Sequence, residues 1–183
     1  ISADGLTYVF TIRDGVTFHS GNPLTAEDAA WSLARVIKLN KTPAFILTQF
    51  GFTADNVDDR IQVVDERTFT VELDKPYAPT FFLYCLTATV GSVVDKQLAL
   101  EHEQDGDLGH AWLRTASAGS GPFKLRSWKP NESLVVDGNP VRHARNLEYG
   151  VWFQLGDGDL DARRLDARPR RPLRRLRRLL TGR

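Results

Sequence analysis

The chain has 183 residues, of which 42% are hydrophobic, 26% charged and 10% aromatic, a composition that is ordinary for a soluble globular protein. No apolar run approaches the roughly 18 residues that a membrane helix needs, and the single cysteine, Cys85, excludes an internal disulfide. Residues 1–156 carry 14 Lys+Arg and 19 Asp+Glu, whereas residues 157–183 carry ten Arg and four Asp, so a mildly acidic body (−5) precedes a strongly basic tail (+6).

The first predicted elements are strands. The stretch "LTYVFTIR", residues 6–13, places large apolar side chains at every second position, which is typical of a strand with one buried face. The turn "RDG" leads into "VTFH", residues 16–19, and the turn "SGNP" follows at residues 20–23. We therefore predict that residues 6–13 and 16–19 pair as a β-hairpin.

The clearest helix signal begins at Thr25. Its hydroxyl can accept a hydrogen bond from the amide of Asp28 while the Asp28 carboxylate reaches back, which is a T-x-x-D variant of the capping box. Apolar residues follow at helical spacing. The pattern predicts a helix over residues 25–38 that buries Leu33 and Val36 and ends near Asn40.

The later elements alternate between strands and helices without a regular βαβ series, which predicts the α+β fold class. A second hairpin is expected at residues 61–76, and "TFFLYCLTATV", residues 80–90, is expected to be a buried helix. Further expected elements are an exposed helix at 93–104, a short helix at 109–115, a third strand pair in 121–128 and 132–138, and a last strand at 147–155.

No constellation of residues indicates catalysis. The turn before the helix contains Pro23, which has no amide hydrogen to offer a phosphate, and His19 beside it is expected to be a hydrogen-bonded structural histidine. The loop "SAGSGPF", residues 117–123, fits neither a dinucleotide loop nor a nucleophile elbow. Its glycines suit a tight loop whose backbone approaches a packed neighbour or a ligand closely.

Metal binding is not indicated either. The stretch "EHEQDGD", residues 101–107, imitates a calcium loop, but its twelfth position is Trp112 where a bidentate Glu belongs. Four histidines without ligand spacing and one cysteine do not make a zinc site. We therefore expect no enzymatic activity, no metal and no cofactor, and the absence of catalytic groups favours a binding role.

Three long stretches, in the right order, resemble family 5 extracellular solute-binding proteins, the dipeptide- and oligopeptide-binding components of bacterial ABC importers. They are "DGLTYVFTIRDGVTFHSGNPLTAEDAAWSLARV" (4–36), "VVDERTFTVELDKPYAPTFFLYCL" (63–86) and "SAGSGPFKLRSWKPNESLVVDGNP" (117–140). The resemblance covers roughly residues 4–155. After the "NP" at residues 139–140 the family usually reads "DYW" or similar, where this chain reads "VRHARNLEYGVWFQL", and the likeness ends near Gly156.

The resemblance implies a type II periplasmic-binding-protein-like fold, of which this chain holds part of lobe one. Residues 1–116 would form the smaller subdomain of that lobe, residues 117–156 would re-enter its main sheet, and residues 157–183 would be an Arg-rich tail. Because the chain begins at Ile1 and contains no Met, we expect an N-terminal fragment of such a protein from which the export signal is missing.

The function that the resemblance implies is the capture of peptides or similar small solutes for import. We expect a periplasmic or extracellular monomer that works with the membrane permease subunits of an ABC transporter and does not bind nucleic acid. Its solute-facing residues are expected after Phe82 and in the Gly-rich loop, where small side chains leave room for a ligand near the backbone. We name Cys85, Thr87, Thr89, Ser117 and Gly119.

Two other functions remain open from the sequence. Four leucines of the tail fall on one helical face among arginines, as a nucleic-acid or membrane-surface binder requires. A hydrolase would need Ser117 or Ser120 with a histidine. We also expect the tail from residue 157 to be a frameshift or read-through product, because the family likeness stops abruptly and the composition turns to Arg, Ala, Leu, Pro and Gly.

Overall fold

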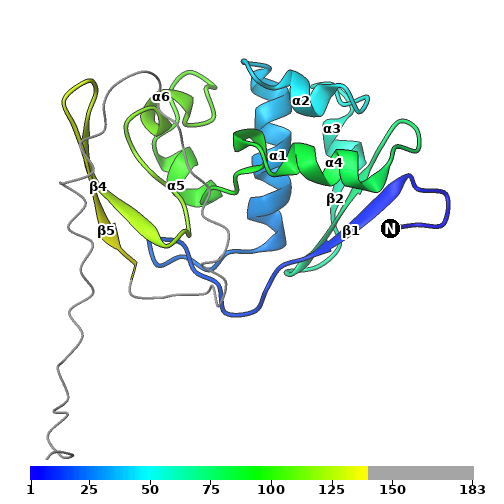
Figure 1. The fold of residues 1–183 in the computed structure, drawn as a ribbon, viewed down its shortest axis with the longest axis horizontal. Helices are drawn as coiled ribbons and strands as arrows, with labels where there is room; N and C mark the ends of the chain where they lie inside the picture. The colour runs from blue at the N-terminus through cyan, green and yellow to red at the C-terminus, as the bar shows by residue number, and fades with distance from the viewer. Residues whose placement is uncertain (140–183) are drawn as a thin grey trace, which may run out of the picture. The chain divides into compact units, whose positions relative to one another are not determined.

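The computed structural model describes residues 1–139, and these mix helices with antiparallel strands, as the α+β prediction requires. A three-stranded sheet is formed by β1 (Thr7–Thr11), β2 (Ile61–Val63) and β3 (Thr68–Glu72) in the order β1-β3-β2. Figure 1 shows this sheet on one side of the long helix α1, with α4 lying across the same region. The sheet and α1 enclose the main hydrophobic core.

The predicted hairpin between residues 6–13 and 16–19 is wrong. β1 pairs instead with β3, which lies more than fifty residues later in the chain, over five residues from Thr7↔Glu72 to Thr11↔Thr68. The pairing brings the rings of Phe10 and Phe69 to 5.1 Å in a stacked arrangement, a cross-strand contact that residues 16–19 do not offer. The residues after the turn form only an isolated bridge, between Thr17 and Pro23.

The second predicted hairpin is confirmed, because β2 and β3 pair antiparallel. The third is confirmed as β4 (Phe123–Lys129) with β5 (Ser133–Gly138), which form a separate two-stranded sheet. The predicted last strand at 147–155 and the basic tail at 157–183 lie outside the described residues.

The helix predicted from Thr25 is α1 (Ala26–Leu39), and both arms of its capping box are present. Asp28 accepts from the Thr25 backbone amide at 2.9 Å. The helix ends at Asn40, whose φ of 45° is left-handed. The predicted burial of Leu33 is confirmed, whereas Val36, which was also predicted to be buried, is only half-buried. The inward face of α1 is centred instead on small residues, Ala26, Ala29, Ala30 and Ala34, which let the helix lie close to the sheet.

Six short helical segments complete the described chain. They are α2 (Phe45–Thr48), α3 (Val57–Arg60), α4 (Pro79–Leu86), the 3₁₀ turn η1 (Thr89–Gly91), α5 (Lys96–Glu101) and α6 (His110–Leu113). The helix predicted within residues 80–90 is confirmed by α4, but the prediction that it is buried is wrong: only Phe82 is buried, at 1% exposure, and its neighbours Phe81, Leu83 and Tyr84 are exposed. High apolar content alone did not distinguish a core helix from one lying on the surface. Among the described residues, no helix has the length and apolar character needed to cross a membrane.

Candidate functional site

Asp95 is the most deeply buried charged residue of the described chain, at 1% exposure, and its carboxylate accepts three hydrogen bonds. Its Oδ2 accepts from Ser20 Oγ at 2.6 Å and from Asn22 Nδ2 at 2.9 Å, and its Oδ1 accepts from the Leu98 amide at 3.0 Å, which caps α5. The Asp95 amide donates to the carbonyl oxygen of Ala118 at 2.9 Å. The Asp95 side chain therefore joins the "SGN" turn to α5, and its backbone amide holds the Gly-rich loop beside them; we call this group the Asp95 junction.

The Gly-rich loop, residues 117–121, is held against the same turn from its other side. The His19 amide donates to the Gly119 carbonyl oxygen at 2.9 Å, and the His19 ring Nε2 lies 2.8 Å from the Gly121 carbonyl oxygen. Lys124 Nζ donates to the His19 carbonyl oxygen at 2.9 Å. The loop thus lies against a packed neighbour, and His19 is the hydrogen-bonded structural histidine that the sequence predicted.

The five predicted solute-facing residues fall into two groups. Ser117 and Gly119 lie in the Gly-rich loop, with Ser117 exposed and Gly119 half-buried. The other three lie at the end of α4 and in η1, and no hydrogen bond among the described residues runs from one group to the other. These three are Cys85, Thr87 and Thr89.

The α4 group is partly occupied by its own chain. The thiol of Cys85 is half-buried and lies 3.7 Å from Gln49 Nε2 of the chain just after α2. The Thr87 hydroxyl donates to the Tyr84 carbonyl oxygen at 2.7 Å, which satisfies a backbone acceptor at the helix end. Thr89 is exposed at the start of η1. Thr89 is thus the residue of this group with an exposed side chain that no described hydrogen bond engages.

The geometry does not provide the groups that the hydrolase alternative needs. The His19 ring bonds to the Gly121 carbonyl oxygen, and in residues 1–139 neither Ser117 nor Ser120 is hydrogen-bonded to a histidine. No three His, Cys, Asp or Glu side chains of this part of the chain gather as a metal site would require.

The loop that imitates a calcium site is a turn with a helix cap. The carboxylate of Asp107 accepts from the amides of Gln104 at 3.1 Å, Gly109 at 2.8 Å and Ala111 at 2.7 Å. These bonds, above all that from Ala111, hold the pKa of Asp107 below its usual value because they stabilise the ionised form. Burial, with the positive charges of Lys41 and of nearby arginines, lowers the pKa of His110.

The described residues line at least two surface hollows. One, of about 390 Å³, lies beside the stacked rings of His102 and Trp112, whose centroids are 4.3 Å apart. The other, of about 330 Å³, lies between the N-termini of α1 and α5 and is floored by Asp28 and Asp95. Neither is lined by any of the five predicted solute-facing residues.

Sequence reasoning missed the Asp95 junction. An Asp before "KQLALE" could have been recognised as a helix cap. Its partners Ser20 and Asn22 lie more than seventy positions earlier, and no spacing rule links them to Asp95.

The comparisons with known proteins agree on one family. Residues 1–147 match "Bacterial extracellular solute-binding proteins, family 5 Middle". The "Probable D,D-dipeptide-binding periplasmic protein DdpA" of Escherichia coli K12 is 34% identical over 139 residues, which is 76% of this chain and 25% of that protein. The oligopeptide-binding protein OppA of Bacillus subtilis is 28% identical over 75% of this chain and 26% of its own length. The chain thus spans about a quarter of the length of these relatives.

Solved structures show the same relationship. NikZ from Campylobacter jejuni, in complex with Ni(L-His), is 28% identical with a TM-score of 0.60 over 76% of this chain and 25% of that one. The periplasmic binding protein DppA from Helicobacter pylori, in complex with the peptide STSA, is 25% identical with a TM-score of 0.53 over 76% and 29%. The described residues therefore have the fold of part of one lobe of a type II periplasmic binding protein, and the chain belongs to the bacterial extracellular solute-binding proteins of family 5.

Proposed function

We propose that this chain is part of the component of a bacterial ABC importer that captures peptides or similar small solutes outside the cytoplasm. The observation that carries the proposal is the family match over residues 1–147, together with a 34% identical relative named as a D,D-dipeptide-binding periplasmic protein.

The partners follow from the same proposal. The solute-loaded protein would meet the permease subunits of the transporter in the periplasm or at the outer face of the membrane, as a monomer. Nothing in the family match or in the named relatives supports the nucleic-acid alternative, which relied on residues 157–183.

The solute-facing residues of the proposal remain those expected from the sequence. Thr89 and Ser117 are exposed, and both can donate to and accept from a peptide backbone. The Gly119 carbonyl oxygen already accepts from the His19 amide, so the main contribution of this glycine would be close approach of the backbone to a solute. Cys85 and Thr87 lie at the end of α4, so they would contact only a solute that reaches this end of the helix.

Binding by this chain alone is expected to be weak. The resemblance implies a ligand enclosed between two lobes, and the chain spans about a quarter of its relatives. The loss of translational and rotational freedom on binding, about 4–15 kcal/mol, is the same whether one lobe or two lobes contact the solute. With fewer contacts to offset it, the affinity should be millimolar or weaker, about −4 kcal/mol or less favourable.

The test is a titration of the isotopically labelled chain with di- to pentapeptides, followed by backbone chemical shifts. We expect small, saturable shifts at residues 85–89 and 117–119, reduced by Thr89→Val and unchanged by Thr53→Val, which alters an exposed threonine on the α3 side of the molecule. Shifts confined to other residues would remove the site assignment, and a micromolar isotherm would show that this part of lobe one holds a complete site. If no peptide produces any shift even at millimolar concentrations, the five named residues do not form a solute-facing surface in this chain.

A further inference from the structure

Three cations from separate parts of the described chain lie around His110. Arg35 is in α1, Lys41 follows the C-terminal cap of that helix at Asn40, and Arg114 caps the C-terminus of α6. Arg114 comes four positions after His110, so the two lie one helical turn apart on the same side of α6. We call Arg35, Lys41, His110 and Arg114 the His110 cluster.

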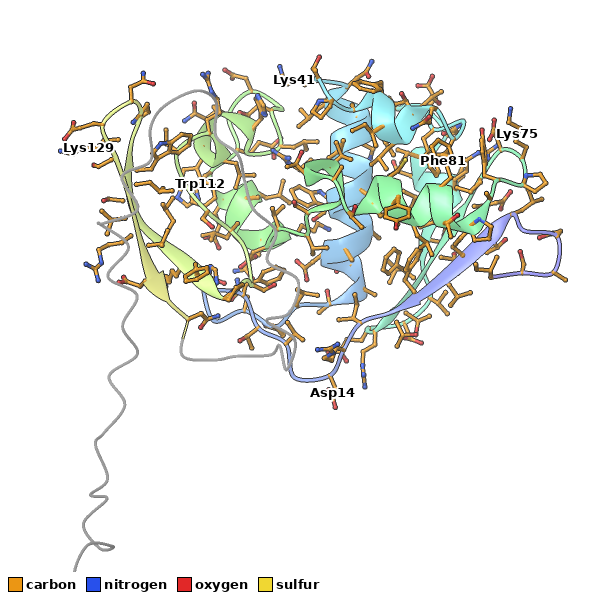
Figure 2. All side chains as sticks on the ribbon, in the orientation of Figure 1. Asp14, Lys41, Lys75, Phe81, Trp112 and Lys129 are labelled. Carbon is orange, nitrogen blue, oxygen red and sulfur yellow. The ribbon has the colours of Figure 1, made fainter. Side chains whose placement is uncertain are left out.

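The charges of the cluster act on one imidazole ring. Burial lowers the pKa of His110, and three positive charges lower it further, those of Lys41, Arg35 and Arg114. The negative charge of Asp107 opposes this shift. Figure 2 shows Lys41 beyond the C-terminal end of α1. The fold therefore brings all three cations close enough to His110 to disfavour its protonated form.

The Arg35 guanidinium is fixed in place and still open to a ligand. Its Nε donates to the Leu108 carbonyl oxygen at 2.7 Å, and its Cζ lies 5.9 Å from the centre of the Trp31 ring. Its two terminal nitrogens have no hydrogen-bond partner in residues 1–139 and are not among the buried unpartnered polar atoms of that region. A guanidinium held in this way can bind a carboxylate through both terminal nitrogens.

The cluster lacks the carboxylates that would match its cations. The oxygens of Asp107 accept from three backbone amides, and none of the three cations forms an ion pair within the part of the chain that the structure describes. Three positive charges and one negative charge leave +2 while His110 is neutral. The C-terminal end of α1 contributes about half a negative charge, so an excess of more than one positive charge remains.

Cations elsewhere in the described chain are better matched. Five of the twelve Lys and Arg of residues 1–139 are in ion pairs with carboxylates, namely Lys38, Arg67, Lys96, Arg126 and Lys129. The β4–β5 hairpin also carries three cations, but both of its carboxylates are in such pairs, and Lys124 donates to the His19 carbonyl oxygen. Outside the cluster and Asp107, residues 1–139 carry 17 carboxylates against nine Lys and Arg. Unpaired positive charge is thus concentrated at the His110 cluster on an otherwise acidic chain.

We propose that the His110 cluster docks a short acidic segment of a protein partner, one that presents several Asp or Glu side chains. Neither surface hollow described above is lined by the cluster, which favours contact with an extended partner over enclosure of a small anion. The four residues are also distinct from those proposed to face a solute.

The length of the segment follows from the surrounding charge. A bilayer or a nucleic acid would extend beyond the cluster onto surfaces where 17 carboxylates repel it. A short segment can contact the cluster alone, because exposed charges are screened over about 8 Å at physiological salt.

The test is a titration of the whole isotopically labelled chain, at low salt, with hexaglutamate that is acetylated and amidated at its ends. Binding is read at the His110 imidazole and at the backbone amides of residues 108–114, because the arginines of residues 163–183 also attract an acidic peptide and total binding would not separate the two. We expect hexaglutamate to raise the pKa of His110, since its carboxylates offset the cations that lower it, and hexaglutamine to leave it unchanged. By linkage, hexaglutamate should bind more tightly as the pH falls from 7.5 to 5.5, and His110→Gln should remove this dependence.

Removal of either exposed cation should weaken the binding. Lys41→Gln and Arg114→Gln should each raise the dissociation constant about two- to fivefold at low salt. Lys129→Gln removes the same charge from the hairpin, which Figure 2 shows apart from Lys41, and should leave the dissociation constant unchanged. All three side chains are exposed, so little loss of stability is expected, and circular dichroism of each variant checks this.

Four results would overturn the proposal. Hexaglutamate that binds without moving the signals of His110 would show that other residues hold it. An equal effect from inorganic phosphate at the same concentration would show a site for a small anion, and broadening of the same signals by phosphatidylglycerol vesicles would show a membrane-facing surface. If hexaglutamate does not bind at all at low salt, the positive charge of the cluster serves only the fold.

Discussion

The Asp95 junction gives the sharpest test of how this part of the lobe is held together. Replacing Asp95 by Ala removes three hydrogen bonds to a buried carboxylate, two from the "SGN" turn and one that caps α5. A hydrogen bond to a charged group contributes about 1.5–3 kcal/mol, and loss of a helix cap costs about 1 kcal/mol. Because Ser20 is exposed and can be hydrated again, we take the lower values and expect a loss on the order of 3–5 kcal/mol.

Such a loss is a large fraction of the roughly 5–15 kcal/mol by which a domain is stable. It is measured by urea unfolding of the whole chain, followed by circular dichroism and by tryptophan fluorescence, with Asp55→Ala as the control because Asp55 is exposed. Asp95→Ala combined with Ser20→Ala should cost less than the sum of the two single changes, since the first already removes their shared bond. A loss below about 1 kcal/mol for Asp95→Ala, with an unchanged slope, would refute the assigned role of the junction.

The remaining predictions concern the core, a close contact and pH. Leu33→Ala, at a buried position of α1, should cost about 2–5 kcal/mol by urea unfolding, and Val36→Ala, at a half-buried one, should cost clearly less; equal costs would contradict the packing. Gly109→Ala should cost more than Gly106→Ala, because both have φ above 70° but only at Gly109 would the new Cβ lie 2.4 Å from a carbonyl oxygen of α5; equal melting temperatures would show that the contact relaxes. The pKa of His110 is lowered in the folded chain from its ordinary value of about 6.5. As the pH falls through that value, the unfolded chain therefore binds a proton at His110 more readily than the folded chain does. Stability should therefore fall as pH decreases from 7.5 to 5.5, and by less in His110→Gln; a steeper fall in the variant would contradict the direction of the shift.

Local chemistry was read correctly from the sequence wherever neighbouring residues decide the outcome. The start of α1 follows from Thr25 and Asp28, which satisfy each other's backbone amides within four residues. The hairpins β2–β3 and β4–β5 follow from alternation around a short turn. The family resemblance, carried by three long stretches in order, was confirmed by the match over residues 1–147.

Contacts between distant parts of the chain were decided by the tertiary structure. The alternation of apolar residues in 6–13 predicted a strand, but it could not identify the strand that pairs with it, because alternation reports only which face of a strand is buried. In the structure β1 pairs with β3, where Phe10 stacks on Phe69, and not with the residues just after the turn. Apolar composition predicted the helix at α4 but not that three of its large side chains face outward. The Asp95 junction joins residues 20, 22, 95 and 118, whose separation in sequence carries no signal, and a buried carboxylate becomes favourable only where the fold brings enough donors to one point.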